Sequence, residues 1–492
     1  MNAVLSTSAL RAVRTTYATR IALITGLALA ARVVFLDHQP LWRDEAFTSI
    51  VVQMPIAQML DAVRMDSAPP LSYLLQHFIA PLWPGPAGLR LVSVFAGAAS
   101  VPVVAALGRR VAGDRGGVAG AILVAVSPAF VLTARDARMY ALATTLVLAS
   151  TLLMVRAIER PSLRQWTVYG AVTTLALYTN YFVALAVIAQ LIGAFIVFRP
   201  GWRTTFKAAA AVAAGLVLLV PWLIAARAQF SHASGFFWVA PVGFTSAGGE
   251  FIQFFTGQAL DGWVPYMALL WTFQGFAAAA GLFAAVTLAW RWRSLPLSGR
   301  RNAMFLLACG GGAILLMFGV SVWRPLVNAR YASVIWGPLY PLIGAGLAVV
   351  GLRIAAAGLL ATASASVALS AVVIHAETPA AVAWLTPRVG AGDFVAAYPT
   401  QYLLLLYYGD SQLAARTHVV SPGGSVDWFW GTAAYPRGAV LDRLPESVTD
   451  TGGTVYYVAQ PYDPAAPAAL PSGYHSTETN CWTGVCVTTY VR

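Results

Sequence analysis

Charged residues are scarce in this sequence. They make up 10% of its 492 residues, whereas soluble domains carry about 25%. Hydrophobic residues account for 59% and the mean hydropathy is +0.69, which excludes an ordinary soluble protein and indicates an integral membrane protein. The net charge of +12 comes almost entirely from arginine. Because the arginines lie in short loops between apolar runs, they indicate membrane orientation, and we expect no nucleic-acid partner.

Cysteine is also rare, and three cysteines are too few for a disulfide framework. Cys309 lies within an apolar run and is expected to be inert. Cys481 and Cys486 are close together near the C-terminus. A small bridged loop there would suit an oxidising compartment, and two free thiols are the alternative. The sequence also lacks a glycine-rich loop that cradles phosphates, so we expect no nucleotide-sugar substrate.

Apolar runs of spanning length recur along most of the sequence. They lie near residues 21–36, 90–108, 117–133, 139–157, 165–179, 180–198, 206–226, 264–290, 303–322, 332–351 and 354–374. Alternate loops are rich in arginine, as the positive-inside rule requires of cytoplasmic loops. We therefore predict an all-α polytopic domain over residues 1–376, with about eleven spans and the N-terminus inside. The arginines before the first run also resemble a signal peptide, but an uncleaved anchor fits the later spans better.

One apolar segment, residues 70–83, is too short for a simple span. A crossing there would invert every later loop. Together with residues 47–64, we interpret it as amphipathic helices at the outer interface or as a re-entrant pair. A twelfth span with a shifted topology is the alternative.

The character of the sequence changes at Glu377. Proline, glycine, serine, threonine and aspartate become more frequent, and residues 393–398 and 454–458 have the pattern of strands. The run 401–408 between them is typical of a helix. We predict a soluble α/β domain over residues 377–492, outside the cytoplasm. No useful internal repeat is present, although repeated halves would have favoured a transporter.

Ionisable and aromatic residues recur in the loops on the predicted outer face. The candidates for a shared polar site at the membrane interface are Arg43, Asp44, Glu45 and Asp66 in the first loop, Arg135, Arg138 and Tyr140 in the second, Asn180 in the third, His232 in the fourth (residues 227–261), and Arg330 and Tyr331 in the fifth. Such a site suits a substrate whose lipid tail stays in the bilayer while its phosphate lies at headgroup depth.

The arginines are the candidates for binding that phosphate. Arg135 and Arg138 are three residues apart at an expected helix start, so both guanidinium groups would point to one side. Snorkelling anchors, or a structural ion pair with Asp136, are the alternatives. Arg330, followed by Tyr331, is a second candidate clamp.

The carboxylates are candidates for acid–base chemistry. Asp44 is the natural general base for an acceptor hydroxyl. Glu45 would be structural or would support the acceptor. Asp66 would orient substrate or bind a divalent cation, but a convincing ligand set is missing because His232 alone is weak evidence for a metal. No cofactor is therefore certain.

Several of these residues also carry a resemblance to a known family. The stretches are Trp42-Arg43-Asp44-Glu45, Asp66-Ser67-Ala68-Pro69-Pro70-Leu71, Gly88-Leu89-Arg90, Ser127-Pro128, Ala134-Arg135-Asp136-Ala137-Arg138-Met139-Tyr140 and Arg330-Tyr331. Their order and spacing resemble the dolichyl-phosphate-mannose protein mannosyltransferases, in particular the bacterial branch that includes the aminoarabinose lipid A transferase type. The family often has histidine before the paired prolines, where this chain has Ala68.

The resemblance implies a C-type membrane glycosyltransferase that takes sugar from a polyprenyl phosphate outside the cytoplasm and inverts the anomeric centre. It also implies that Asp44 matches the catalytic acidic position and Arg138 a phosphate-contacting arginine. We expect a multi-pass plasma-membrane enzyme with an extracytoplasmic active site. Mannose is the favoured sugar and a pentose the next. The acceptor is a protein, a glycolipid or a glycan. A transporter or flippase of a lipid-linked sugar is the alternative, and a non-catalytic scaffold is a further one.

Overall fold

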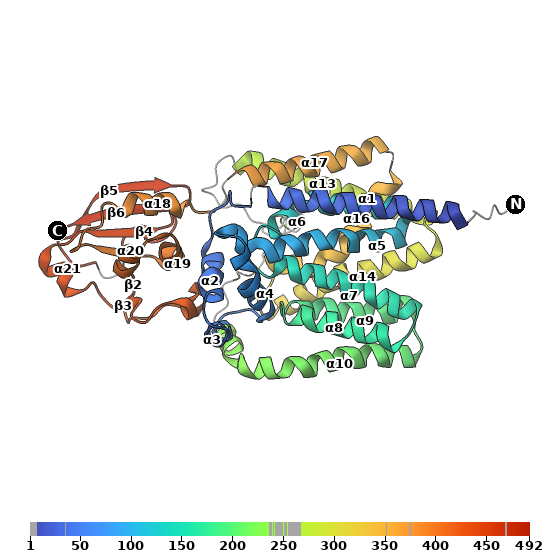
Figure 1. The fold of residues 1–492 in the computed structure, drawn as a ribbon, viewed down its shortest axis with the longest axis horizontal. Coiled ribbons are helices and arrows are strands. Elements are labelled where there is room, and N and C mark those ends of the chain that lie inside the picture. Colours follow the sequence, from blue (N-terminus) through green and yellow to red (C-terminus); the bar gives the residue numbers. More distant parts are fainter. Residues whose placement is uncertain are drawn as a thin grey trace.

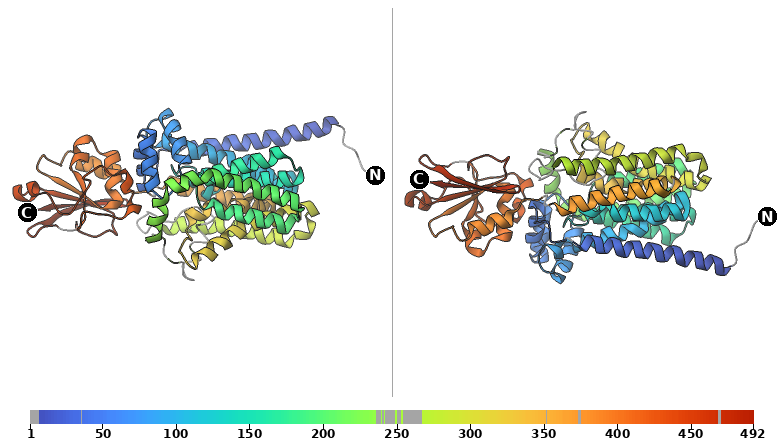
Figure 2. Two further views of the ribbon diagram at one scale, coloured as in Figure 1. Left: turned by 90° about the horizontal axis from the view of Figure 1, so that it is seen from below. Right: turned by 90° about the horizontal axis from the view of Figure 1, so that it is seen from above.

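A helical bundle and a smaller sheet domain make up the computed structural model, which describes residues 7–34, 36–235, 239, 241, 249, 253, 267–350, 352–372, 375–467 and 470–492. The sheet domain lies beyond one end of the bundle, and the first described helix begins at the other end (Figure 1). Both rotated views in Figure 2 show the same order. The predicted fold class, a polytopic helical domain followed by an α/β domain, is confirmed.

Long apolar helices form the bundle. They and the short helices joining them are α1 (Thr7–Val33), α5 (Pro86–Val126), α6 (Pro128–Thr133), α7 (Tyr140–Glu159), α8 (Leu163–Leu177), α9 (Val183–Phe198), α10 (Trp202–Ala225), α11 (Arg227–Gly235), α13 (Met267–Trp290), η2 (Trp292–Ser294), α14 (Leu297–Ser321), α15 (Ala329–Trp336), η3 (Gly337–Leu339), α16 (Tyr340–Val349) and α17 (Leu352–Ala371). Among the described residues, seven helices are long and apolar enough to cross a membrane. The chain is thus a multi-pass membrane protein, while the count of eleven spans stays a prediction.

The helix α5 is a hairpin of two helical halves. Its helical geometry is interrupted at Ala112 and Gly113, where glycine adopts a φ of 65°. Beyond this break the chain runs back along itself, because a Cβ added to Gly116 would lie 2.8 Å from the carbonyl oxygen of Gly108. Two predicted spans, 90–108 and 117–133, therefore pack closely through small residues, as is common between membrane helices.

A second close approach joins α5 to α16. A Cβ on Gly344 would lie 2.4 Å from the Cα of Gly120. The two backbones therefore touch where both residues lack side chains.

The buried guanidinium group of Arg32 caps the C-terminal end of α5. Its side chain is fully buried, and it donates hydrogen bonds to the carbonyl oxygens of Ala28 (3.0 Å), Val124 (2.9 Å) and Ala125 (3.3 Å). The last turn of α5 has unpaired carbonyls there, because Pro128 cannot supply an N–H. Arg32 thus stabilises the end of that helix.

Short helices lie between the bundle and the sheet domain (Figure 1). They are α2 (Arg43–Val52), α3 (Ile56–Met65), α4 (Leu71–Ile79) and η1 (Ala80–Leu82). They occupy the segments 47–64 and 70–83 for which amphipathic or re-entrant helices were predicted. Pro55 precedes α3 and Pro70 precedes α4, which separates the helices because proline disfavours a helical residue before it.

The C-terminal domain is a six-stranded mixed sheet with the strand order β3-β2-β1-β4-β6-β5. The strands are β1 (Phe394–Ala397), β2 (Thr417–Val420), β3 (Val440–Leu441), β4 (Val455–Ala459), β5 (His475–Trp482) and β6 (Val485–Val491). The first four are parallel, and β6 and β5 are antiparallel to their neighbours. The helices are α18 (Thr378–Leu385), α19 (Pro399–Tyr408), α20 (Ser411–Arg416), η4 (Trp428–Trp430), η5 (Thr432–Ala434) and α21 (Glu446–Thr451). The predicted strands and helix correspond to β1, β4 and α19, while the boundary at residue 377 stays a prediction.

Cys481 and Cys486 form a disulfide across the β5–β6 hairpin. They face each other in the strand register, next to the turn that joins the strands. Of the two alternatives drawn from the sequence, the bridged loop is the one that the structure has. Cys309 is buried in α14.

Candidate active site

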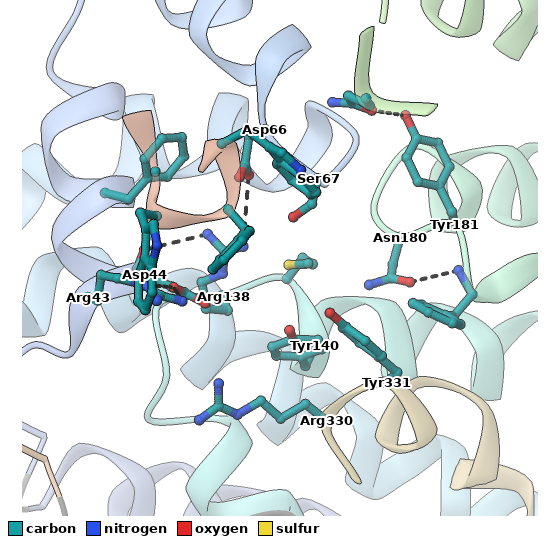
Figure 3. Close-up of a pocket in the computed structure, with 18 of the residues that line it drawn as sticks. Arg43, Asp44, Asp66, Ser67, Arg138, Tyr140, Asn180, Tyr181, Arg330 and Tyr331 are labelled. Carbon is teal, nitrogen blue, oxygen red and sulfur yellow. Dashed lines mark hydrogen bonds and ion pairs between the residues drawn. The ribbon is translucent and has the colours of Figure 1, made fainter. Parts of the chain in front are cut away.

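A cavity of about 560 Å³ lies where the end of the bundle meets the C-terminal domain. Eight of the eleven predicted site residues line it: Arg43, Asp44, Asp66, Arg138, Tyr140, Asn180, Arg330 and Tyr331. Figure 3 shows these side chains around one space although they come from five separate parts of the chain. The structure thus brings together residues that are up to 288 positions apart in sequence (Arg43 to Tyr331).

Asp44 lies in the first turn of α2, where the helix dipole favours a negative charge. Arg43 donates to its Oδ1 through Nε (3.1 Å) and Nη2 (3.0 Å). Burial alone would raise the pKa of Asp44, but the charges of Arg43, Arg138 and Arg330 outweigh burial and hold the pKa below its usual value. With 24% of its side chain exposed, Asp44 presents an ionised carboxylate to the cavity.

Arg138 is the centre of a hydrogen-bond network beneath Asp44. Its Nη1 donates to the hydroxyl of Tyr73 (2.9 Å) and to Oγ1 of Thr48 (3.2 Å). Its Nη2 lies 4.0 Å from Oδ2 of Asp66, to which Tyr73 donates at 2.8 Å. Burial disfavours its charge, but Tyr73, Asp44 and Asp66 outweigh burial and raise the pKa of Arg138 well above its usual value. Arg138 is therefore a fixed positive charge.

Asp66 shares this network with Asp44. Burial is the largest influence on Asp66 and raises its pKa, and Arg138 opposes that shift. Within the described residues, no group of three or more His, Cys, Asp and Glu side chains is arranged to hold a metal ion. The positive charge between Asp44 and Asp66 is instead the guanidinium of Arg138.

Glu45 does not line the cavity. Its side chain and that of Arg90 are both fully buried, and Arg90 donates to Oε1 (2.8 Å) and Oε2 (2.6 Å) of Glu45. Oε1 also accepts from the backbone N–H of Ala137 at 2.8 Å. The remaining donors of Arg90 bind the carbonyl oxygens of residues 36, 39 and 40. Glu45 is therefore bonded to the turn at residues 134–139 that carries Arg138.

Arg135 points away from Arg138. Its Nη2 donates to the carbonyl oxygens of Ala31 (2.5 Å) and Val34 (2.8 Å), at the end of α1. The expectation that both arginines aim at one side assumed a helix, but residues 134–139 form turns and bends. A spacing of three therefore does not place the two side chains on one face. Arg135 thus caps the end of α1.

Arg330 lies in the first turn of α15 on the other side of the cavity (Figure 3). Its guanidinium carbon is 4.1 Å from the ring centroid of Trp42, a cation–π contact. Trp42 in turn donates to Oδ1 of Asp136 at 3.1 Å. Within the described part of the chain, no hydrogen bond occupies the guanidinium of Arg330, so its donors are available to a ligand. Tyr140, at the start of α7, lies between Arg330 and Arg138, whose charges both act on it.

Asn180 and Tyr331 form the side of the cavity next to α9. The Asn180 side-chain oxygen accepts from the N–H of Phe182 at 2.8 Å. Tyr331 stacks on Phe182 with ring centroids 4.5 Å apart. Leu185 and Leu326 also line this side, so it is apolar. His232 lies in α11, but its side chain and most of the loop 227–261 are outside the described residues.

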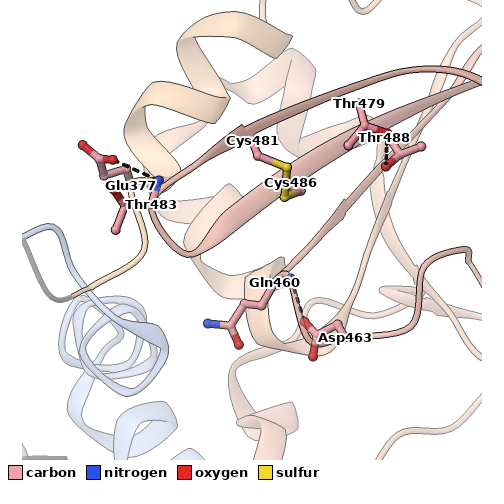
Figure 4. The surroundings of a disulfide bond; sticks show 8 residues. All are labelled: Glu377, Gln460, Asp463, Thr479, Cys481, Thr483, Cys486 and Thr488. Carbon is pink, nitrogen blue, oxygen red and sulfur yellow. Dashed lines mark hydrogen bonds between the residues drawn. A yellow bond between two sulfur atoms is a disulfide. The ribbon is translucent and has the colours of Figure 1, made fainter. Parts of the chain in front are cut away.

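The C-terminal domain supplies the wall that the sequence did not predict. Its lining residues are Thr400, Leu403, Trp428, Phe429, Trp430, Gly431, Gln460, Tyr462 and Asp463. Arg43 lies 4.9 Å from the ring centroid of Trp430, which joins the two domains at the cavity. Figure 4 shows Gln460 and Asp463 on one loop, where Asp463 accepts from the N–H of Gln460 at 2.8 Å. The consecutive aromatic residues 428–430 were the signal available in the sequence.

Comparisons with known proteins agree with the predicted resemblance. Residues 66–224 match the family described as dolichyl-phosphate-mannose-protein mannosyltransferase. No curated protein matches the chain. The fold is similar to ArnT from Cupriavidus metallidurans, solved in an apo state (14% identity, 95% of this chain and 97% of that chain, TM-score 0.61) and bound to undecaprenyl phosphate (TM-score 0.58).

It is also similar to the archaeal oligosaccharyltransferase AglB from Archaeoglobus fulgidus, solved with an inhibitory peptide and a dolichol-phosphate. That similarity has 11% identity and a TM-score of 0.54, and covers 91% of this chain and 69% of that chain. At these identities the likeness concerns the fold.

Proposed function

We propose that this chain is an inverting glycosyltransferase that moves a sugar from a polyprenyl-phosphate donor to an extracytoplasmic acceptor. The observation that carries the proposal is the cavity in which an ionised Asp44 faces the guanidinium groups of Arg138 and Arg330. The matched family and the lipid phosphates bound by the two similar structures support this class of donor. Mannose is the first choice of sugar because of the family match, and a pentose is the second.

Asp44 acts as the general base. The acceptor hydroxyl attacks the anomeric carbon while its proton passes to the Asp44 carboxylate. As the new C–O bond forms, the bond from the anomeric carbon to the phosphate oxygen breaks, and that oxygen keeps the electron pair. The products are the glycosylated acceptor and a polyprenyl phosphate. Because attack and departure occur on opposite faces, the anomeric configuration inverts.

The arginines stabilise the departing phosphate. Charge develops on its oxygens in the transition state, and preorganised guanidinium groups in a partly dry cavity are effective there. Arg330, whose guanidinium has no hydrogen-bond partner among the described residues, is the primary phosphate ligand and is held in place by Trp42. Arg138 is already engaged by Tyr73, Thr48 and Asp66, so it contributes mainly as a fixed positive charge. No general acid is then needed.

The apolar side of the cavity suits the lipid. Phe182, Leu185 and Leu326 line it beside Tyr331. A polyprenyl chain entering along α9 would remain in apolar surroundings while its phosphate reaches Arg330.

The extracytoplasmic location rests on two observations. The disulfide between Cys481 and Cys486 suits an oxidising compartment. The arginine-rich loops predicted to be cytoplasmic join helices at the end of the bundle away from the C-terminal domain, as the loop between α7 and α8 shows (Figure 1). Both support a plasma-membrane protein whose active site faces outwards.

The rival transporter needs ionisable groups that line a path through the bilayer. Arg32 was the main candidate for such a group, and it is capping the carbonyls at the end of α5. This observation favours the enzyme over the transporter.

The test is sugar transfer by the purified full-length protein in detergent, without any gradient. The donors are synthetic polyprenyl-phosphate mannose and polyprenyl-phosphate arabinose, and the readout is release of polyprenyl phosphate. Asp44→Asn should lower the rate by about 100-fold or more, the usual contribution of a general base. Asp61→Asn is the control, because Asp61 is exposed and pairs with Arg64 on the same helix, away from the cavity lining. Full activity of Asp44→Asn would overturn the proposal.

A further inference from the structure

A second cavity, of about 430 Å³, lies in the C-terminal domain. It is lined by the last residues of the parallel strands β1 and β2, Ala397 and Val420, by Tyr457 within β4, and by the loops that follow these strands. Its volume falls in the range of about 300–1,000 Å³ that is usual for ligand sites.

The topology of the sheet explains why a cavity forms there. From β1 the chain moves to β2 and β3 on one side, and then returns to β4 on the other side of β1. The connections leave β1 and β4 in opposite directions, so a crevice opens at the carboxyl ends of these strands. In open α/β sheets this switch point is the usual place for a ligand.

The second cavity is separated from the active site by a single layer of side chains. Trp430 lines both cavities. Three loops each contribute neighbouring residues to the two sides: Pro399 and Thr400, Asp427 and Trp428, and Pro464 and Asp463, the first of each pair facing the second cavity. The carboxyl edge of the sheet therefore faces the active site, and Trp430 stands between the two cavities.

The chemistry of this edge suits a carbohydrate. The aromatic rings of Tyr398, Trp430 and Tyr457 line the second cavity, and Trp428 and Tyr462 line the active site beside it. Such rings offer apolar faces to sugar rings. Asp427 contributes a carboxylate to the second cavity and Asp463 one to the active site, and carboxylates are acceptors for sugar hydroxyl groups. A peptide bound in an extended form would instead use an open sheet edge. The edge strands β3 and β5 contribute no residue to either cavity.

We propose that the acceptor is a glycan, and that the cavity at the carboxyl ends of β1, β2 and β4 binds the sugar units behind the one that receives the new sugar. Trp430 is the platform between the two positions. The inference rests on the proposed function, since it assigns the acceptor of that reaction. It predicts that the protein distinguishes acceptors by length, and that the C-terminal domain makes this distinction.

The experiment measures binding rather than turnover, so its result is independent of the transfer assay. Full-length Asp44→Asn protein in detergent is titrated with mannose and arabinose ligands of one to four linked units. Saturation-transfer NMR measures the affinity for each ligand. Ser425→Trp is the test variant, because Ser425 is exposed and lines only the second cavity. Ser447→Trp is the matched control, an exposed serine on α21 that lines neither cavity.

We expect the affinity to rise about tenfold or more from one unit to three, which corresponds to about 1.4 kcal/mol. Ser425→Trp should abolish this rise and leave the single unit unaffected, while Ser447→Trp should change neither. Affinity that does not depend on length would overturn the proposal, as would a rise that survives Ser425→Trp. Binding of a serine- or threonine-containing peptide in place of the oligosaccharides would do the same. Failure of the proposed function would appear instead as absent sugar transfer in the wild type.

Discussion

Asp44 and Glu45 are consecutive in the first turn of α2, yet 24% of the Asp44 side chain is exposed and none of the Glu45 side chain is. The helical step of about 100° between neighbours turns one carboxylate to the cavity and the other to the protein interior. Each carboxylate pairs with an arginine from a different helix position, Arg43 in α2 and Arg90 in α5. Arg43 holds Asp44 at the surface of the cavity, and Arg90 holds Glu45 in the core.

Glu45→Gln should destabilise the protein by about 3–5 kcal/mol, because it leaves Arg90 charged and unpaired in a buried place. Unfolding by a denaturing detergent, followed by tryptophan fluorescence, measures the change. The double variant Glu45→Met with Arg90→Met should recover most of the loss, because removal of both charges is often neutral. A single variant as stable as the wild type would show that the pair does not hold this region.

Arg330→Ala should raise the KM for the lipid donor by about 10- to 100-fold, the range for one or two charge-assisted hydrogen bonds of about 1.5–3 kcal/mol. Arg330→Lys should recover part of the loss, since it keeps the charge without the planar fork. The matched control is Arg135→Ala, which removes an arginine bound to α1 carbonyls outside the main cavity. Equal effects of both alanine variants on the donor KM would refute the assignment of Arg330.

Asp136 should make stability depend on pH. Burial, followed by the charge of Glu45, raises the pKa of Asp136 to about 7 in the folded protein. Its pKa in the unfolded chain is near 3.8. Between these values the folded state binds more protons, so stability falls as the pH rises towards 7 and stays lower above it.

Asp136→Asn is neutral at every pH and lacks this loss. Thermal unfolding of the variant and the wild type is measured between pH 5 and pH 8. The midpoint of the variant should rise relative to that of the wild type as the pH increases. Parallel curves would rule out the titration of Asp136 in that range.

Gly344→Ala should destabilise the bundle by about 1–3 kcal/mol, the usual cost of overpacking. The added Cβ would meet backbone atoms of Gly120 at 2.4 Å and 2.6 Å, which no rotamer change can relieve. Gly275→Ala in α13 is the control, because nothing lies within 4 Å of its added Cβ. It should be neutral or slightly stabilising, since alanine favours helix. Detergent unfolding of both variants checks the difference.

Much of the fold was predictable from local patterns. Each predicted apolar run falls on a helix in its described part, because spanning length and arginine-rich loops are properties of continuous sequence. The strands β1 and β4 were predictable from their runs of apolar and aromatic residues. The hairpin within α5 was expected as two spans, 90–108 and 117–133, whereas the left-handed glycine at position 113 that turns the chain was not.

The membrane side of the candidate site was also largely predictable. Asp44, Arg138 and Arg330 line the cavity as expected. Arg135 and Glu45 were expected in the site but do not line the cavity. The backbone at Arg135 is not helical, and Glu45 is buried against Arg90, a partner 45 residues away in sequence. The wall from the C-terminal domain could not be predicted, because its contact with α2 joins residues nearly 390 positions apart, as Arg43 and Trp430 do. No periodicity in the sequence encodes such a contact.

Trp430 belongs to the sheet domain, but Arg43, whose guanidinium contacts the face of its ring, belongs to α2. The cavity of the candidate active site is thus closed only where the sheet domain meets α2. A chimaera that joins these helices to a foreign C-terminal module would keep its donor machinery and inherit another acceptor preference. Exchange of the module therefore offers a simple evolutionary route to new products.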